Sequence, residues 1–193
     1  MKKMRKIGLF FGSFNPVHVG HMIIANFMAQ RTDLDQVWLV VSPLNPLKIK
    51  SSLANDYERL HLVTLAIGNN PNIRVSDIEF SLPKPSYTID TLTYLKEKYP
   101  DDSFALIMGG DNLQTLHKWK NAEMIRQHQI YVYDRPGYDS EKFRVQEGFT
   151  FVEAPLLHIS ASYIRKSITE GFSIQYLVPD QVFEYINSGN LYK

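Results

Sequence analysis

The chain has 193 residues, of which 44% are hydrophobic and 21% charged, and its 21 basic and 20 acidic side chains give a formal net charge of +1. This size and composition indicate a single globular domain over residues 1–193, and the balanced charge argues against a protein held to nucleic acid by phosphate neutralisation. The chain contains no cysteine, which excludes disulfides, thiolate catalysis and cysteine-ligated zinc or iron–sulfur centres.

The first residues are basic, but the apolar stretch that follows, Ile7 to Phe11, is too short for the core of a signal peptide. No run of the sequence approaches the roughly 20 apolar residues of a membrane span. We therefore expect a soluble protein of the cytoplasm that binds neither a membrane nor nucleic acid. The sequence leaves open whether the protein forms a homo-oligomer.

Short β-branched or aromatic runs alternate with stretches of helical periodicity, which favours an α/β fold with a largely parallel sheet. In chain order, we predict a strand at 7–11, a helix at about 19–30, a strand at 37–41, a helix at 54–67, a strand at 73–78 and a helix at 88–99. Strands at 104–108, 130–133 and 149–152 follow, and helices at about 162–170 and 180–187 complete the prediction. Ligands of open parallel sheets bind outside the carboxyl ends of the strands, so we expect the functional residues in the loops that follow the strands.

A turn and a helix start follow the first predicted strand, in the sequence Gly12-Ser13-Phe14-Asn15-Pro16-Val17-His18-Val19-Gly20-His21. Gly12 permits a tight turn and a close approach of the backbone to a phosphate, and the helix start offers unpaired N–H groups to an anion. His18 and His21 lie three residues apart and share one face of the helix, where two imidazoles could donate hydrogen bonds to phosphate oxygens. Taken alone, the pair could equally bind a metal ion or be two unrelated surface histidines.

This stretch resembles the G-x-F-[DN]-P-x-H-x-G-H signature of the nucleotidylyltransferase superfamily. The resemblance implies a Rossmann-like, doubly wound, mostly parallel sheet with C-terminal helices. It also implies that the α-phosphate of ATP lies near His18 and His21, beside the turn formed by Gly12, Ser13 and Phe14. Many relatives have an aspartate at the position of Asn15, so we assign this residue a role in the turn and none in catalysis.

A second candidate phosphate-binding segment is Ile159-Ser160-Ala161-Ser162-Tyr163-Ile164-Arg165, which is similar to the I-S-[ST]-[ST]-x-I-R motif of the same superfamily. Ser160 is a good N-cap, so this helix start could bind phosphate through its hydroxyl and backbone N–H groups. The planar guanidinium of Arg165 could reach the same phosphate, although a capped surface helix with a solvated arginine is the alternative. Lys48, in the proline-containing loop after the second strand, is either a further contact with ATP or an exposed loop lysine.

Two middle segments indicate the acceptor. The segment Pro85 to Leu92 is similar to the P-S-Y-T-x-D-T-L string of bacterial nicotinate mononucleotide adenylyltransferases, and Met108 to Trp119, which opens with a Gly-Gly-Asp turn, resembles their G-x-D-x-L…W segment. This resemblance implies transfer of the adenylyl group of ATP to nicotinate mononucleotide, with release of pyrophosphate and formation of nicotinate adenine dinucleotide in NAD biosynthesis. It also implies Mg²⁺ as the ion that accompanies ATP, and no metal site built by the protein alone is predicted.

The residues of these segments suit a pyridine-carboxylate acceptor. Trp119 offers a flat face for stacking on a nicotinate ring, and backbone N–H groups around Tyr87 and Thr88 could bind its carboxylate. Asp111 could accept hydrogen bonds from ribose hydroxyls or orient its loop. Core packing is the alternative role for Trp119, and an N-cap is the alternative for Thr88.

Other acceptors, such as phosphopantetheine or nicotinamide mononucleotide, and a non-catalytic module that senses NAD stay open as alternatives. A dehydrogenase and a P-loop kinase are disfavoured because the chain lacks G-x-G-x-x-G after its first strand and lacks G-x-x-x-x-G-K-[ST]. A zinc hydrolase would need a third ligand, and neither His61 nor His158 has a spacing that suggests it.

Overall fold

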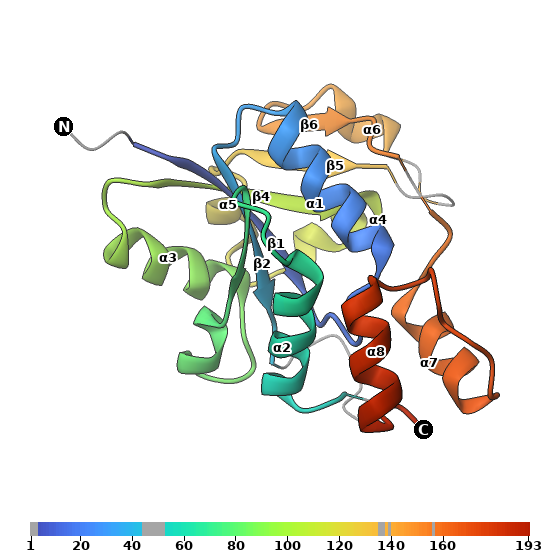
Figure 1. Ribbon diagram of the computed structural model, residues 1–193. Helices are drawn as coiled ribbons and strands as arrows, with labels where there is room; N and C mark the ends of the chain where they lie inside the picture. Colours follow the sequence, from blue (N-terminus) through green and yellow to red (C-terminus); the bar gives the residue numbers. More distant parts are fainter. Residues whose placement is uncertain (1–3, 44–52, 135–137, 139, 156) are drawn as a thin grey trace.

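The computed structural model describes residues 4–43, 53–134, 138, 140–155 and 157–193. Its centre is a six-stranded sheet in the order β3-β2-β1-β4-β5-β6, and every pair of neighbouring strands is parallel (Figure 1). The strands are β1 (Lys6–Gly12), β2 (Gln36–Val41), β3 (Ile73–Ser76), β4 (Ser103–Gly109), β5 (Ile130–Tyr133) and β6 (Phe149–Val152). The predicted Rossmann-like, doubly wound fold is confirmed.

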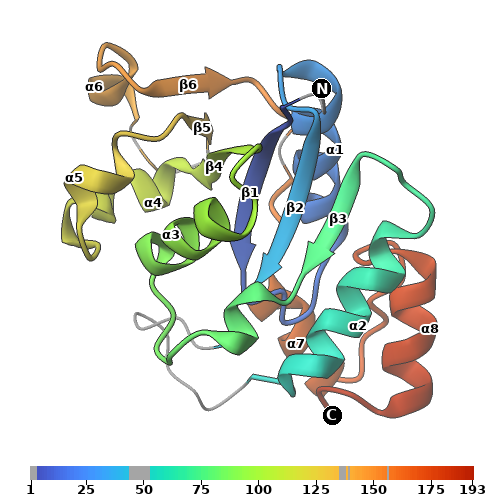
Figure 2. The same cartoon turned by 90° about the vertical axis from the view of Figure 1, so that its left-hand side faces the viewer.

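Helices cover both faces of the sheet and bury two separate apolar cores. The first core lies under α1 (Val19–Arg31), α2 (Asp56–Ile67), α7 (Ala161–Thr169) and α8 (Asp180–Gly189). The second lies under α3 (Thr88–Lys98), α4 (Gly110–Thr115), the 3₁₀ helix η3 (Leu116–Lys118) and α5 (Ala122–Ile125). Figure 2 shows α3 and α5 on one side of the strands and α2 and α8 on the other. Helix α6 (Glu141–Arg144) precedes β6.

The central strands are apolar on both faces because each face is covered by helices. In β1, Ile7 and Leu9 point into the second core, whereas Phe10 points into the first, as the period of two along a strand requires. All three side chains are at most 4% exposed. This double burial explains why the strand is a continuous apolar run rather than an alternating one.

Two short predictions were wrong in detail. The third strand was predicted to reach Ile78 but ends at Ser76, because Asp77 turns the chain into the 3₁₀ helix η2 (Ile78–Ser81). The Gly-Gly-Asp segment after β4 was predicted as a turn, but α4 begins directly at Gly110. None of the helices in the described ranges is long and apolar enough to cross a membrane.

The strand order places a switch point between β1 and β4. The helix that follows β1 covers one face of the sheet, and the helix that follows β4 covers the other. The two connections therefore diverge at the carboxyl ends of these neighbouring strands, where open α/β sheets hold their ligands.

Candidate active site

A cavity of about 720 Å³ lies at this switch point. It is bounded by the carboxyl ends of β1 and β4 and by the starts of α1, α3, α4 and α7. Eleven of the residues singled out in the sequence line it, namely Gly12, Ser13, Phe14, His18, His21, Tyr87, Thr88, Asp111, Trp119, Ser160 and Arg165. Lys48 lies outside the described residues, so its contact with ATP stays a prediction.

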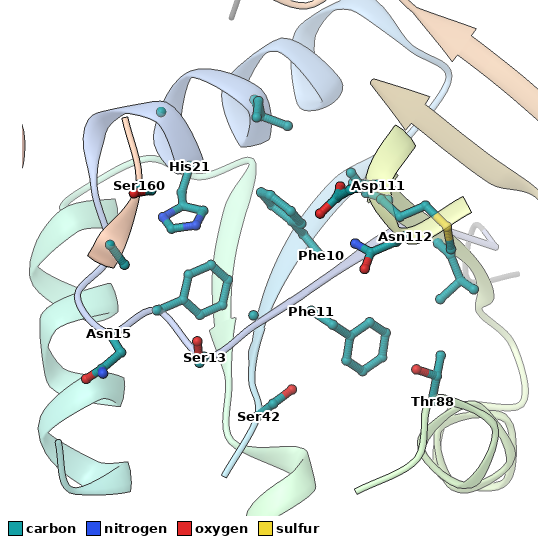
Figure 3. Close-up of a pocket in the computed structure, with 18 of the residues that line it drawn as sticks. Phe10, Phe11, Ser13, Asn15, His21, Ser42, Thr88, Asp111, Asn112 and Ser160 are labelled. Atoms are coloured by element: carbon teal, nitrogen blue, oxygen red, sulfur yellow. The ribbon is translucent and has the colours of Figure 1, made fainter. Parts of the chain in front are cut away.

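The end of β1 divides the cavity into two sides. In Figure 3, His21 and Ser160 lie on one side of the Phe10–Ser13 segment, and Thr88 lies on the other. Asp111, in the first turn of α4, is close to Phe10 in the same view. His21 and Ser160, predicted to bind ATP, thus face a common space from the side opposite to Thr88, which is predicted to bind the acceptor. Asp111, also predicted to bind the acceptor, lies on the side of His21 in this view.

The loop after β1 is held in an unusual conformation by close packing. Phe14 has a φ of 44°, in the left-handed region that a bulky residue rarely adopts, and its side chain is only 1% exposed. Its ring lies against Gly12, where a Cβ atom would come within 2.8 Å of the Phe14 Cζ atom. The sequence suggested that Gly12 leaves room for a phosphate. In the structure, the space beside Gly12 is occupied by the phenyl ring of Phe14.

A buried arginine ties this loop to the neighbouring segments. Arg59 of α2 is 0% exposed, and its Nη1 donates to the carbonyl oxygens of Ser13, at 2.5 Å, and Ser42, at 3.0 Å. Its Nε donates to the carbonyl of Ala54 at 3.1 Å, and its Nη2 pairs with Asp56 at 2.6 Å. One guanidinium therefore fixes the loop after β1, the end of β2 and the start of α2 relative to each other.

The two histidines form a stacked pair at the start of α1. Their ring centroids are 3.6 Å apart with an interplanar angle of 25°, and the backbone N–H of His18 donates to Nδ1 of His21 at 3.2 Å. His18 is 7% exposed, so its ring is enclosed at the edge of the cavity. The two imidazoles therefore lie on one face of the helix, as predicted, and their stacked rings both line the cavity.

Gly20 provides the space that this stack requires. A Cβ atom at Gly20 would lie 3.1 Å from Nδ1 and 3.2 Å from Cε1 of His18. We expect Gly20→Ala to displace the His18 ring by a few tenths of an ångström and to lower kcat by about tenfold, because catalytic groups tolerate little misplacement. The melting temperature should not fall, since alanine favours a helix over glycine by about 1 kcal/mol.

Gly189→Ala in α8 is a matched control, because a Cβ atom there meets only Leu191 at 3.6 Å. Steady-state kinetics and thermal melts of both variants would test this role. An unchanged kcat in the Gly20 variant would show that the His18 ring is not constrained by this glycine.

The start of α7 closes the same side of the cavity. Ser160 caps the helix as predicted, because its Oγ accepts a hydrogen bond from the N–H of Tyr163 at 3.1 Å. Arg165 donates from Nη1 to the carbonyl of Asn15 at 2.6 Å, so α7 is anchored to the loop after β1. Asn15 is 1% exposed and accepts from the N–H of Ala54 at 3.0 Å, in keeping with a role in the turn.

The opposite side is formed by the start of α3 and the end of η3. Tyr87 is the N-cap of α3 and Thr88 is its first residue, so the predicted helix start is confirmed. Trp119 ends η3 and packs against the second core, and its Nε1 is buried without a hydrogen-bond partner among the described residues. Lys120 lies 4.9 Å from the centre of the Tyr87 ring and pairs with Asp90. The Tyr87 ring, the indole N–H of Trp119 and the ammonium group of Lys120 thus lie at this end of the cavity.

Sequence reasoning missed a buried acid in this region. Glu79 of η2 is 2% exposed and lines the cavity. Burial raises the pKa of its carboxyl group, and the hydroxyls of Ser42, Thr91 and Ser86 partly oppose this shift. Nothing in the string Asp-Ile-Glu distinguishes Glu79 from a surface acid, and no periodicity accompanies it, so only the tertiary structure identifies it.

Comparisons with known proteins agree with this geometry. Residues 9–167 match the family model described as cytidylyltransferase-like. A probable nicotinate-nucleotide adenylyltransferase of Cytophaga hutchinsonii is 56% identical, over 97% of this chain and 98% of that protein. One from Bacillus licheniformis is 35% identical, over 98% of this chain and 100% of that protein.

Solved structures share the fold. Nicotinic acid mononucleotide adenylyltransferase of Plasmodium falciparum, complexed with NaAD, superposes with a TM-score of 0.84 at 22% identity and covers 97% of each chain. A putative nicotinate-nucleotide adenylyltransferase from Vibrio parahaemolyticus superposes with a TM-score of 0.72 at 24% identity, over 95% of this chain and 99% of that one. At these identities the superpositions establish the architecture.

Proposed function

The chain belongs to the nicotinate-nucleotide adenylyltransferase family, and we propose that it transfers the adenylyl group of ATP to nicotinate mononucleotide through the residues that line its central cavity. The products are pyrophosphate and nicotinate adenine dinucleotide, a precursor of NAD. The observation that carries this assignment is the position of the stacked histidines opposite the start of α3, in one cavity at the switch point of the sheet.

In the proposed reaction, a phosphate oxygen of the acceptor attacks the α-phosphorus of ATP in line. A new P–O bond forms as the bond from the α-phosphorus to the leaving pyrophosphate breaks. Positioning and charge stabilisation carry such transfers, and no covalent intermediate on the enzyme is needed. His18 and His21 donate hydrogen bonds to the non-bridging α-phosphate oxygens, where negative charge develops.

The remaining phosphates of ATP bind at the α7 side. Ser160 begins a nine-residue helix, Ala161–Thr169, whose N–H groups and dipole favour an anion. Arg165 adds a cationic fork beside the same helix start and the Gly12–Phe14 loop. This places the leaving pyrophosphate next to groups that stabilise its charge.

We propose Mg²⁺ as the divalent ion of the reaction, bound mainly to the phosphates of ATP. The described residues contain no cluster of three histidine, aspartate or glutamate side chains, so the donor set suits an ion held by the substrate and water. When bound, such an ion neutralises charge on the phosphate oxygens. In this proposal, Asp111 at the cavity wall accepts hydrogen bonds from ribose hydroxyls.

The acceptor binds at the α3 side. Backbone N–H groups at Tyr87 and Thr88 donate to the pyridine carboxylate, and Trp119 stacks on the ring. We also propose the cytoplasm as the location of the protein.

The test supplies the protein with ATP and Mg²⁺ and one acceptor at a time, nicotinate mononucleotide, nicotinamide mononucleotide or phosphopantetheine, and measures pyrophosphate release. We expect the highest kcat/KM with nicotinate mononucleotide. Trp119→Ala should raise the KM for that acceptor by about tenfold or more, since stacking on an aromatic ring contributes about 1–3 kcal/mol per base. Pyrophosphate release with phosphopantetheine alone would contradict the assigned acceptor. If none of the three acceptors gave pyrophosphate, the proposed catalytic activity would be wrong.

A further inference from the structure

Glu79 has no role in the proposed chemistry, yet its burial carries a free-energy cost. Transfer of a carboxyl group from water to a protein interior disfavours its ionised form, and burial raises its pKa accordingly. The folded chain holds this proton to a higher pH than the unfolded chain does. The residue therefore opposes folding once the pH exceeds the ordinary glutamate value of 4.5 and rises through the raised pKa.

The carboxyl group contacts residues from the segments around the acceptor side of the cavity. Thr91 of α3 donates from Oγ1 to Oε1 of Glu79 at 2.8 Å, and the same hydroxyl lies 3.4 Å from the carbonyl oxygen of Tyr87. The hydroxyls of Ser86, just before α3, and Ser42, just after β2, lower the pKa of this carboxyl. Oε2 of Glu79 and Oγ of Ser86 are both buried without a hydrogen-bond partner among the described residues. Among the residues that the structure describes, its polar neighbours are thus hydroxyl groups.

These neighbours connect Glu79 to the helix start that faces the acceptor. Ser86 is 8% exposed and Thr91 is 0% exposed, so both side chains are buried. They lie on either side of Thr88, the first residue of α3. The hydrogen bond from Thr91 to Glu79 therefore ties the first turn of α3 to η2.

We propose that Glu79 is a positioning residue for the acceptor, which holds the first turn of α3 so that Tyr87 and Thr88 present their N–H groups to the acceptor's carboxylate. This inference rests on the proposed function of the same helix start. Glu79 acts through its hydrogen bond with Thr91 rather than by contact with ATP. It therefore sets the affinity for the acceptor and leaves the adenylyl donor side unaffected.

The test compares Glu79→Leu, Glu79→Gln and Thr91→Val with wild type by steady-state kinetics in each substrate. We expect Glu79→Leu to raise the KM for the acceptor by about tenfold, because a displaced helix start misplaces its donors. The KM for ATP should change by less than about twofold, because its phosphates bind on the other side of β1. Thr91→Val should shift the acceptor KM in the same direction, and Glu79→Gln should restore most of the affinity, since its amide oxygen accepts from Thr91.

Asp77→Asn is the matched control, because Asp77 is an exposed acid at the start of the same 3₁₀ helix. Equal changes in both KM values, or a Glu79→Gln variant no better than Glu79→Leu, would overturn the proposal. If Glu79→Leu does not fold, the acceptor KM values of Thr91→Val and Glu79→Gln test the proposal. Wild-type turnover with each acceptor is measured first, so a wrong acceptor appears in the wild type, whereas a wrong role for Glu79 appears only in the variants.

Discussion

Replacement of His18 by alanine is expected to lower kcat by about a hundredfold to a thousandfold, the usual effect of removing a hydrogen-bond donor from a developing oxyanion. The KM for ATP should change far less, because His18 acts on charge that appears in the transition state. The backbone N–H of His18, which donates to His21 at 3.2 Å, is kept in this variant, so the start of α1 should persist. Single-turnover measurements of pyrophosphate release would give the effect on the chemical step.

The stacking of the two rings also predicts how the effects of replacing His18 and His21 combine. Because the ring centroids lie 3.6 Å apart and both rings are proposed to bind one phosphate, the effects of removing them should not be additive. We expect His18→Ala/His21→Ala to lose no more than about a further tenfold beyond the more damaging single variant. Gln30→Ala, exposed on the same helix, is the control and should retain wild-type kinetics. A kcat for His18→Ala close to that of the control would exclude this histidine from catalysis.

Arg59→Met is expected to destabilise the fold more than any surface change. The variant leaves the carbonyls of Ser13, Ser42 and Ala54 without their buried donor. It also leaves the carboxylate of Asp56 paired with Lys84 but without its buried partner. Removal of one member of a buried ion pair and hydrogen-bond cluster costs about 2–4 kcal/mol, less than for a fully enclosed pair because Asp56 is 27% exposed. For a domain of this size, the melting temperature should fall by about 5–15 °C.

The control for this variant is Arg31→Met, the same substitution at an exposed residue in the last turn of α1. Thermal unfolding by circular dichroism, with saturating ATP in a parallel series, would measure both variants. Because Arg59 also orders the loop after β1, we expect ATP to protect Arg59→Met less than it protects wild type. A melting temperature within about 2 °C of wild type would show that water or backbone rearrangement replaces the guanidinium.

Much of the fold could be predicted because each buried strand is a short run of β-branched or aromatic residues. The strands at 130–133 and 149–152 have the predicted bounds, and the helix at 88–99 ends within one residue of its prediction. The elements that were missed, such as α4 and α5, have six and four residues, too few for a helical period to show. The loops that carry the motifs were predictable because glycine, proline and histidine stand in a fixed order there.

The residues that hold the site together could not be predicted in the same way. Arg59 bonds a carbonyl 46 positions away, and Glu79 bonds a hydroxyl 12 positions away, so neither contact leaves a local pattern. The common face of His18 and His21 was predicted from their spacing, but the stacking of their rings and the space that Gly20 leaves for it were not. Local sequence thus predicted which residues line the cavity better than which residues hold that cavity in place.

The cavity is lined by residues from both faces of the sheet, and this arrangement affects how substrate specificity can change among such enzymes. On the proposed assignment, the donor ATP is held from the face covered by α1 and α7, and the acceptor from the face covered by α3 to α5. The sheet separates these two faces, so substitutions in one core need not repack the other. A new acceptor could then be recruited by changes confined to residues 77–126, while the machinery that activates ATP is inherited intact.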